Sequence, residues 1–406
     1  MEEIMEKKNR VAIVAARRTA IGAFQGMYSG TSVVDLGVAA AAAVLEQSGL
    51  EAGQVDECIV GNILSAGQKQ NIARQISIGA GLSDTVPAYT VNKLCGSGLK
   101  SVALGVGAIQ LGDAEIVLAG GAENMTMTPY ALPSGRSGAR LGNTEVIDLI
   151  LQDGLTDAFH GYHMGITAEN LAEKWQISRE QQDEFAAASQ NKAEAAIQAG
   201  KFKEEIVPVQ IPQRKGDPLI VAQDEFPRFG VTAEALGKLR PAFKKDGTVT
   251  AGNASGINDG AAMVMLSSET AVEKHGLKVM AWIESYGSAA LDPAYMGYGP
   301  VPATRQALQR AGWTLQDIEL AELNEAFSAQ SMAVLKGFEQ ELGGISPDIV
   351  NVNGGAIALG HPIGASGTRI LVTLLYEMQR RGVHKGLASL CIGGGQGMSV
   401  LLNIPE

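Results

Sequence analysis

Two cysteines and one histidine, each beside a glycine-rich turn, carry the most informative chemistry in this chain. Cys95 stands in the sequence Asn-Lys-Leu-Cys-Gly-Ser-Gly-Leu, directly before an apolar helical pattern. The N-terminus of a helix offers free N–H groups and partial positive charge, which favour a thiolate over a thiol. His361 lies in a second glycine-rich segment, and Cys391 precedes three glycines at 393–395. Two thiols and an imidazole in such turns are the groups that thioester chemistry requires.

The same residues have ordinary structural explanations. A lone cysteine is commonly a small buried hydrophobe, and Cys391 could end a core strand. Cys58 sits in an apolar run without glycines, so we predict that it packs in the core. His361 precedes Pro362 and could be a turn histidine, although imidazole is the usual base for a thiol. We discount a zinc site because the chain has no C-x-x-C or H-x-x-x-H pair.

Other polar positions also keep two interpretations. Asn324 follows the apolar run 318–323 and could cap a helix or hold a water near a developing oxyanion. His163 and Met164 precede a helical pattern and could be surface-turn residues or binding residues. The Gly/Asn loop at 252–260 is a turn cluster rather than a Walker loop, since no Gly-Lys-Ser/Thr follows it.

Composition bounds the class of protein. The chain has 406 residues, 46% of them apolar and 18% charged, which predicts a globular protein of two or three domains. A net charge of −11 argues against a nucleic-acid or membrane surface, and three cysteines favour a reducing compartment. Residues 1–10 resemble no signal or transit peptide, the C-terminus lacks Ser-Lys-Leu, and no window approaches 18 uninterrupted apolar residues. We therefore expect a cytoplasmic protein without a transmembrane helix.

Strand and helix patterns must position these side chains. Buried strands are predicted at 11–15, 57–61 and 116–119, the last one ended by Gly120-Gly121. Helical patterns cover 33–47 and the stretch from Ser97, where apolar residues recur at i, i+3, i+4 and i+7. This alternation predicts a mainly parallel, layered sheet.

The middle of the chain differs in composition from its two ends. From about 125 to 256, proline, serine, glycine and charge rise, and amphipathic helices are predicted near 166–175 and 179–200. We interpret this stretch as an insertion that carries binding loops. The two ends of the chain show the same order of elements. Gly-Ser-Gly at 96–98 and Ala-Ser-Gly at 365–367 each precede a predicted helix, a strand and a glycine cluster. This internal repeat indicates a duplicated half.

Together and in order, these motifs resemble the thiolase family along nearly the whole chain. The segments that carry the resemblance are the Cys95 turn, 157–159, 163–165, 239–243, 248–256, 324–327, the His361 turn and 391–395. The resemblance implies an α/β fold with a five-layer αβαβα core from two duplicated halves. It divides the chain into an N-terminal half (1–124 and 257–278), an inserted loop domain for coenzyme A binding and oligomerisation (125–256) and a C-terminal half (279–406).

The resemblance also implies a role for each site residue. Cys95 would be the acyl-accepting nucleophile, His361 its activating base, and Cys391 the acid/base at the substrate α-carbon. One oxyanion hole would combine His361 with a water held by Asn324, and the other the backbone N–H groups of Cys95 and Gly393. The coenzyme A tunnel would be lined by Leu155, His163, Met164, Arg228, Phe243, Ala251, Ser255, Ala326 and Phe327. Arg228 would lie against the adenine, which suits a planar cation.

The activity implied is a reversible Claisen condensation of two acetyl-CoA to acetoacetyl-CoA and CoA through an acetyl-Cys95 intermediate. No metal or redox cofactor is expected, and the resemblance implies a homotetramer or a tight dimer. A degradative thiolase acting on longer 3-ketoacyl-CoA chains is the alternative, although His163 before Met164 favours the short-chain form. A noncatalytic acyl-CoA or lipid-binding protein on the same fold is disfavoured by the complete set of reactive residues. A Cys-His-Asn hydrolase would leave Cys391 unexplained.

Overall fold

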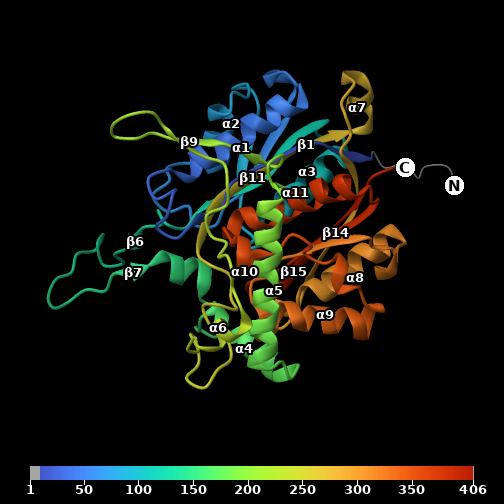
Figure 1. Ribbon diagram of the computed structural model, residues 1–406. Coiled ribbons are helices and arrows are strands. Elements are labelled where there is room, and N and C mark those ends of the chain that lie inside the picture. Colours follow the sequence, from blue (N-terminus) through green and yellow to red (C-terminus); the bar gives the residue numbers. More distant parts are fainter. Residues whose placement is uncertain (1–9, 406) are drawn as a thin grey trace, which may run out of the picture.

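The structure, a computed structural model, describes residues 10–405 and shows an α/β molecule layered around one large sheet (Figure 1). Residues 1–9, part of the segment predicted to be neither a signal nor a transit peptide, lie outside the described residues, as does Glu406. The strands are β1 (Val11–Thr19), β2 (Gly22–Ala23), β3 (Glu57–Gly61), β4 (Ala88–Val91), β5 (Ile116–Asn124), β6 (Tyr130–Ala131), β7 (Ile147–Asp148), β8 (Ile206–Val207), β9 (Val209–Ile211), β10 (Leu219–Val221), β11 (Asn258–Ser268), β12 (Ala281–Ala290), β13 (Leu320–Leu323), β14 (Lys385–Ile392) and β15 (Gln396–Asn403). The α-helices are α1 (Val33–Ser48), α2 (Ile72–Gly79), α3 (Ser97–Leu111), α4 (Met164–Lys174), α5 (Arg179–Gln198), α6 (Ala233–Gly237), α7 (Glu269–His275), α8 (Pro300–Ala311), α9 (Ser328–Leu342), α10 (Ala356–Leu359) and α11 (Ile363–Arg381).

The main sheet consists of two halves that share a short seam. Its strand order is β13-β14-β15-β12-β1-β11-β5-β3-β4. The halves meet where β1 pairs with β12 over only three residues, Val11 to Ile13, whereas β1 pairs with β11 along most of its length. Strands β12 to β15 form one half, and strands β1 to β5 with β11 form the other.

The prediction of a mainly parallel sheet is wrong. Strand β3 runs parallel to β4 and β5, β13 runs parallel to β14, and the short β8 runs parallel to β1. The pairs β1–β11, β1–β12, β5–β11, β12–β15 and β14–β15 are antiparallel. The reason is visible at the end of the chain, where only the turn 393–395 separates β14 from β15. A connection that short permits only antiparallel neighbours, because parallel strands need a longer crossover.

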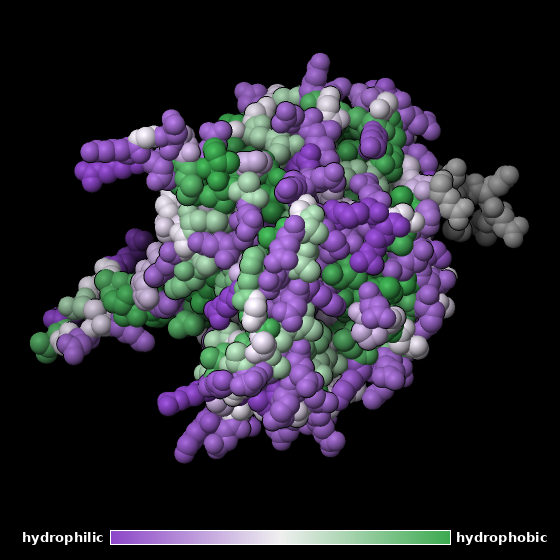
Figure 2. Space-filling view, in the orientation of Figure 1, coloured by the Kyte–Doolittle hydropathy of each residue, from purple (hydrophilic) through white to green (hydrophobic). Residues whose placement is uncertain are grey.

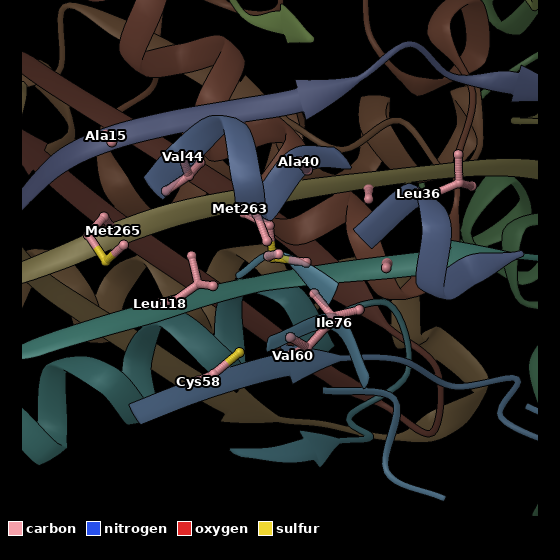
Figure 3. Close-up of a cluster of buried hydrophobic side chains, with 14 of the residues drawn as sticks. Ala15, Leu36, Ala40, Val44, Cys58, Val60, Ile76, Leu118, Met263 and Met265 are labelled. Carbon is pink, nitrogen blue, oxygen red and sulfur yellow. The ribbon is translucent and has the colours of Figure 1, made fainter. Parts of the chain in front are cut away.

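Helices complete the five predicted layers. Helices α3 and α11 lie together between the two half-sheets, and their apolar side chains share one buried cluster with both halves. Helices α1 and α2 cover the outer face of the N-terminal half-sheet, where Leu36, Val44 and Ile76 pack on Leu118 and Met263 (Figure 3). Helices α8 and α9 cover the outer face of the other half-sheet. The order αβαβα follows from these three cores.

The structure confirms one local prediction and changes the bounds of two predicted elements. Cys58 is fully buried in the outer core of the N-terminal half, which confirms its prediction as a packing residue (Figure 3). Strand β5 does not end at Gly120-Gly121 but continues to Asn124. The continuation is possible because its neighbour β11 pairs with it as far as Asn124. Helix α11 begins at Ile363, so the Ala-Ser-Gly sequence lies inside its first turns rather than before it.

The stretch 125–256 contains the long helices α4 and α5 together with short strands and loops. Its β6–β7 hairpin carries an arm that projects from the body of the molecule (Figure 1). The limits of the inserted domain stay a prediction. Among residues 10–405, the segment Leu94–Leu111 is long and apolar enough to cross a membrane. It consists of the Cys95 turn and α3, which lies between the half-sheets, and 56% of it is buried.

Candidate active site

Cys95 lies in a strained turn at the N-terminus of α3. The preceding Leu94 has φ = 48°, a left-handed conformation that costs a non-glycine residue about 1–3 kcal/mol and is found disproportionately at functional sites. Ser97 holds the turn, since its Oγ accepts from the Lys93 backbone N–H at 2.8 Å and donates to the Leu94 carbonyl at 2.7 Å. The turn therefore presents the Cys95 thiol in one fixed direction.

A cavity of about 660 Å³ opens in front of Cys95. It brings together residues far apart in the sequence, because Cys95, His361, Cys391 and Gly393 all line it. The nine residues predicted to form a substrate tunnel line the same cavity, namely Leu155, His163, Met164, Arg228, Phe243, Ala251, Ser255, Ala326 and Phe327. A volume of this size suits a small-molecule ligand with a long arm.

The imidazole of His361 is fixed by hydrogen bonds at its backbone and its ring. Its backbone N–H donates to Oδ1 of Asn258 at 2.8 Å, and its Nδ1 lies 2.5 Å from Oγ of Ser366. Because the Ser366 hydroxyl donates its own proton to the Pro362 carbonyl at 2.9 Å, it must accept from Nδ1–H. In the neutral ring Nε2 is then unprotonated and free to take a proton.

Burial determines the resting charges of His361 and Cys95. It lowers the pKa of His361 to about 4, with the Arg369 guanidinium acting in the same direction. Burial also raises the pKa of Cys95 to about 11, although N–H groups of Gly393 and of Cys95 itself oppose the shift. The N–H groups thus act in the direction expected of a helix N-terminus, which favours the thiolate. Desolvation outweighs the helix field, and the resting pair is thiol and neutral imidazole.

Cys391 is fully buried where it lines the cavity, whereas Cys95 is partly exposed. It stands near the end of β14, before a turn in which Gly394 and Gly395 have φ = 75° and 77°. A Cβ on Gly395 would lie 2.2 Å from the Leu291 carbonyl, so this close approach requires glycine. Burial and then the neighbouring Cys95 raise the pKa of Cys391 above that of an ordinary thiol. Once deprotonated, such a thiol is a strong base.

Asn324 is the one predicted catalytic residue that does not line the cavity. It follows β13, and α9 begins four residues later with Phe327 at its N-cap, so Asn324 caps no helix. Its side chain is buried, and neither amide atom has a hydrogen-bond partner among residues 10–405. A buried amide in this state has its full capacity to bind a further polar group.

His163 and Met164 belong to the cavity wall rather than to a surface turn. Nδ1 of His163 accepts from the Gly165 N–H at 3.0 Å and so caps α4, while the ring stacks on Phe243 at 4.5 Å. Gly165 makes this stacking possible, since a Cβ there would lie 2.2 Å from the Phe243 ring. Arg228 is exposed at the cavity mouth, and its backbone N–H donates to Oε1 of Gln190 at 2.9 Å.

Sequence reasoning missed residues that hold the reactive groups in place. From the sequence, Ser366 was noted only as part of the repeated Ser-Gly pattern, and Asn258 only as part of the turn cluster at 252–260. Glu123 was missed because strand β5 was ended too early. The spacing of five residues between His361 and Ser366, across a helix start, is the one signal that could have suggested their pairing.

Comparison with known proteins gives one consistent result. Residues 11–270 match the family model "Thiolase, N-terminal domain", and residues 277–404 match "Thiolase, C-terminal domain". The chain is 60% identical over 392 residues to the acetyl-CoA acetyltransferase of Pseudomonas aeruginosa, covering 97% of this chain and 98% of that one. It is 57% identical to the Escherichia coli protein of the same name, covering 96% and 98%. The crystal structure of the Bacillus anthracis acetyl-CoA acetyltransferase superposes with a TM-score of 0.94 at 44% identity, over 98% and 99% of the two chains.

Proposed function

Since the chain belongs to the thiolase family, we propose that it is an acetyl-CoA C-acetyltransferase, which interconverts two acetyl-CoA with acetoacetyl-CoA and CoA. Relatives of 53–60% identity carry that name. The observation that carries the proposal is the meeting of Cys95, His361 and Cys391, from three separate segments, at one cavity. A noncatalytic binding protein would need none of these groups together.

Cys95 accepts the acetyl group in the first half-reaction. Its proton passes to Nε2 of His361, and the thiolate attacks the thioester carbonyl of acetyl-CoA. The C–S bond to coenzyme A breaks, and the departing sulfur takes the proton of Cys391. Because one thioester replaces another, the transfer is nearly balanced in energy. It leaves acetyl-Cys95, an imidazolium and a Cys391 thiolate.

Cys391 acts as base in the second half-reaction. Its thiolate removes a proton from the methyl carbon of a second acetyl-CoA, and the resulting carbanion attacks the acetyl carbonyl on Cys95. The C–S bond to Cys95 breaks, acetoacetyl-CoA forms, and His361 returns a proton to Cys95. All groups are then in their starting state, so protons balance over the cycle.

The methyl carbon is far less acidic than a thiol, and each pKa unit of mismatch costs about 1.4 kcal/mol. Stabilisation of the enolate oxygen must supply the difference, and one well-aimed donor contributes about 2.7–4 kcal/mol. We assign this role to His361 and a water held by the unpaired amide of Asn324. The N–H groups of Cys95 and Gly393 serve the tetrahedral intermediate on Cys95. This chemistry needs no metal or redox cofactor.

The cavity wall supports the assignment of coenzyme A as carrier. The tunnel residues lead from the reactive thiols to Arg228 at the mouth, where a planar cation suits stacking on the adenine. Met164 packs in the same buried cluster as Cys391, and His163 lines the cavity beside it in the chain; these bulky side chains favour a two-carbon acyl group. A degradative enzyme for longer chains is the alternative.

One assay separates these two activities. Thiolysis of acetoacetyl-CoA should exceed that of a C8 3-ketoacyl-CoA by at least about tenfold in kcat/KM, since overpacking costs about 1–3 kcal/mol. Met164→Ala should narrow the ratio. Equal kcat/KM for both substrates in the wild type would assign the chain to the degradative group, and release of free acetate would indicate a hydrolase.

A second copy of this chain is the partner we propose for the projecting arm, giving a homo-oligomer. The β6–β7 arm exposes Tyr130, Leu132, Leu141 and Val146, and hydrophobic residues stand both at its tip and nearer the body, with polar residues between them (Figure 2). Large apolar side chains exposed together on one projecting element are typical of an interaction surface. Leu141→Asp should lower the molecular mass measured by light scattering relative to the wild type.

A cytoplasmic location is proposed because Cys58, Cys95 and Cys391 are all free thiols, which a reducing compartment preserves.

A further inference from the structure

Glu123, near the end of β5, is a fully buried carboxylate beside the site that the proposed reaction does not use. Each of its oxygens accepts two N–H groups. Oε1 accepts from the Asn62 side chain at 2.8 Å and the Leu64 backbone at 3.1 Å, and Oε2 accepts from the Ile63 backbone at 3.1 Å and the Gly364 backbone at 2.9 Å. All four hydrogen bonds are donated to the carboxylate, so each of them favours its ionised form.

The four donors come from both halves of the fold. Ile63 and Leu64 follow β3 and belong to the same apolar cluster as Cys95 and its neighbour Leu94. Gly364 lies in the first turn of α11, immediately after the turn that carries His361. The Glu123 carboxylate thus links residues 62–64, which pack near Cys95, to the first turn of α11, which follows His361.

The link to α11 replaces an ordinary helix cap. The N-cap residue of this helix is Pro362, which has no side-chain acceptor, so its free N–H groups need a partner from elsewhere. Glu123 supplies that acceptor and a negative charge at the positive end of the helix. A Cβ on Gly364 would lie 2.6 Å from Oε2 of Glu123, so glycine is needed for this approach.

Charge also connects Glu123 to the nucleophile. Burial raises the pKa of Glu123 to about 7, the N–H groups of Leu64, Ile63 and Gly364 oppose the shift, and the neighbouring carboxylate of Asp259 adds to it. Burial is the main cause of the raised pKa of Cys95, and the negative charge of Glu123 adds a smaller contribution in the same direction. The carboxylate therefore disfavours a resting thiolate.

We propose that Glu123 is a positioning residue of the condensation reaction, which ties the segment behind the Cys95 turn to the turn that carries His361 and places a negative charge near the Cys95 thiol. The kinetic part of this proposal rests on the proposed function. The electrostatic part can be measured from the reactivity of the Cys95 thiol, without any turnover of substrate.

Glu123→Gln tests both parts. We expect kcat for acetoacetyl-CoA thiolysis to fall by about 100-fold, because misplaced reacting groups lose that much rate. KM should stay within about twofold, since Glu123 does not line the cavity. The pH midpoint of Cys95 alkylation by iodoacetamide, followed by peptide mass spectrometry, should fall as the repelling charge is removed. An unmoved midpoint, or a kcat within about threefold of wild type, would overturn the proposal.

Two further variants make the result decisive. Glu123→Asp keeps the charge but shortens the reach, so it should lower kcat and leave the midpoint in place; a wild-type kcat would overturn the proposal even if Glu123→Gln does not fold. Glu169→Gln is the matched control, because Glu169 is a buried carboxylate that accepts from the Thr248 and Val249 backbones and does not influence Cys95. An equal midpoint shift in this control would also refute the proposal. A wild type without thiolysis would refute the proposed function, while the alkylation result would still decide the electrostatic part.

Discussion

Gly98 on α3 and Thr368 on α11 touch so closely that a Cβ on Gly98 would lie 2.8 Å from the Thr368 backbone nitrogen. The contact is reciprocal, since a Cβ on Gly367 would lie 2.6 Å from the backbone nitrogen of Leu99. Each glycine thus packs against the residue that follows the other glycine. This symmetry is the structural form of the internal repeat in the sequence, and it brings the first turns of both helices together beneath Cys95 and His361.

Gly98→Ala should therefore destabilise the protein by about 1–3 kcal/mol, because the new methyl group overpacks a backbone contact. Gly107→Ala is the matched control on the same helix, where a Cβ would meet no atom within 4 Å. It should be neutral or stabilising by up to about 1 kcal/mol, since alanine favours the helix. Denaturant unfolding measures both changes, and equal stabilities for the two variants would contradict the packing argument.

Ser366→Ala should lower kcat by about tenfold or more with little change in KM. The substitution leaves Nδ1–H of His361 without its acceptor, so the ring loses its preferred tautomer and orientation. Steady-state thiolysis measures the effect. Ser101→Ala removes an equally buried serine whose Oγ lies 2.7 Å from both the Gly98 and the Gly120 carbonyl oxygens and shares its one proton between them, and this control should retain a larger share of kcat.

Cys95→Ser should abolish both thiolysis and condensation. A serine hydroxyl is far less acidic than a thiol, so a neutral imidazole cannot activate it to the same degree. Incubation with radiolabelled acetyl-CoA should label the wild type and not the variant. Stable label at another residue of the variant would refute Cys95 as the acyl acceptor.

Cys391→Ala should separate the two half-reactions. Acetyl-Cys95 should still form, because coenzyme A can depart as a thiolate without a proton from Cys391. Synthesis of acetoacetyl-CoA should fall by orders of magnitude, because the base for the methyl carbon is gone. Intact-protein mass spectrometry detects the acetyl-enzyme, and near-normal condensation would exclude Cys391 as that base.

The free enzyme should react with iodoacetamide increasingly fast as the pH rises. Because the pKa of Cys95 is raised to about 11, the thiol stays protonated at neutral pH, and the thiolate fraction grows about tenfold per pH unit below that value. His361, with its pKa lowered to about 4, stays neutral across this range. An alkylation rate that levels off by pH 7 would indicate a preformed thiolate–imidazolium pair instead.

The sequence by itself determined the reactive groups and the class of reaction. Cys95, His361 and Cys391 were recognisable because reactive side chains in tight turns need adjacent glycines, and that local requirement leaves a local pattern. The helices starting at Val33, Ser97 and Arg179 were equally predictable, since their capping and periodicity lie within a few residues.

Only the tertiary structure decided what depends on long-range neighbours. The direction of β11 and β15, the continuation of β5 to Asn124, and the raised pKa of Cys95 all follow from partners far away in the chain. Glu123 shows the limit most clearly, because its four donors come from residues 62–64 and from Gly364. Desolvation and hydrogen-bond partnership are properties of the packed molecule, and no local pattern of residues carries them.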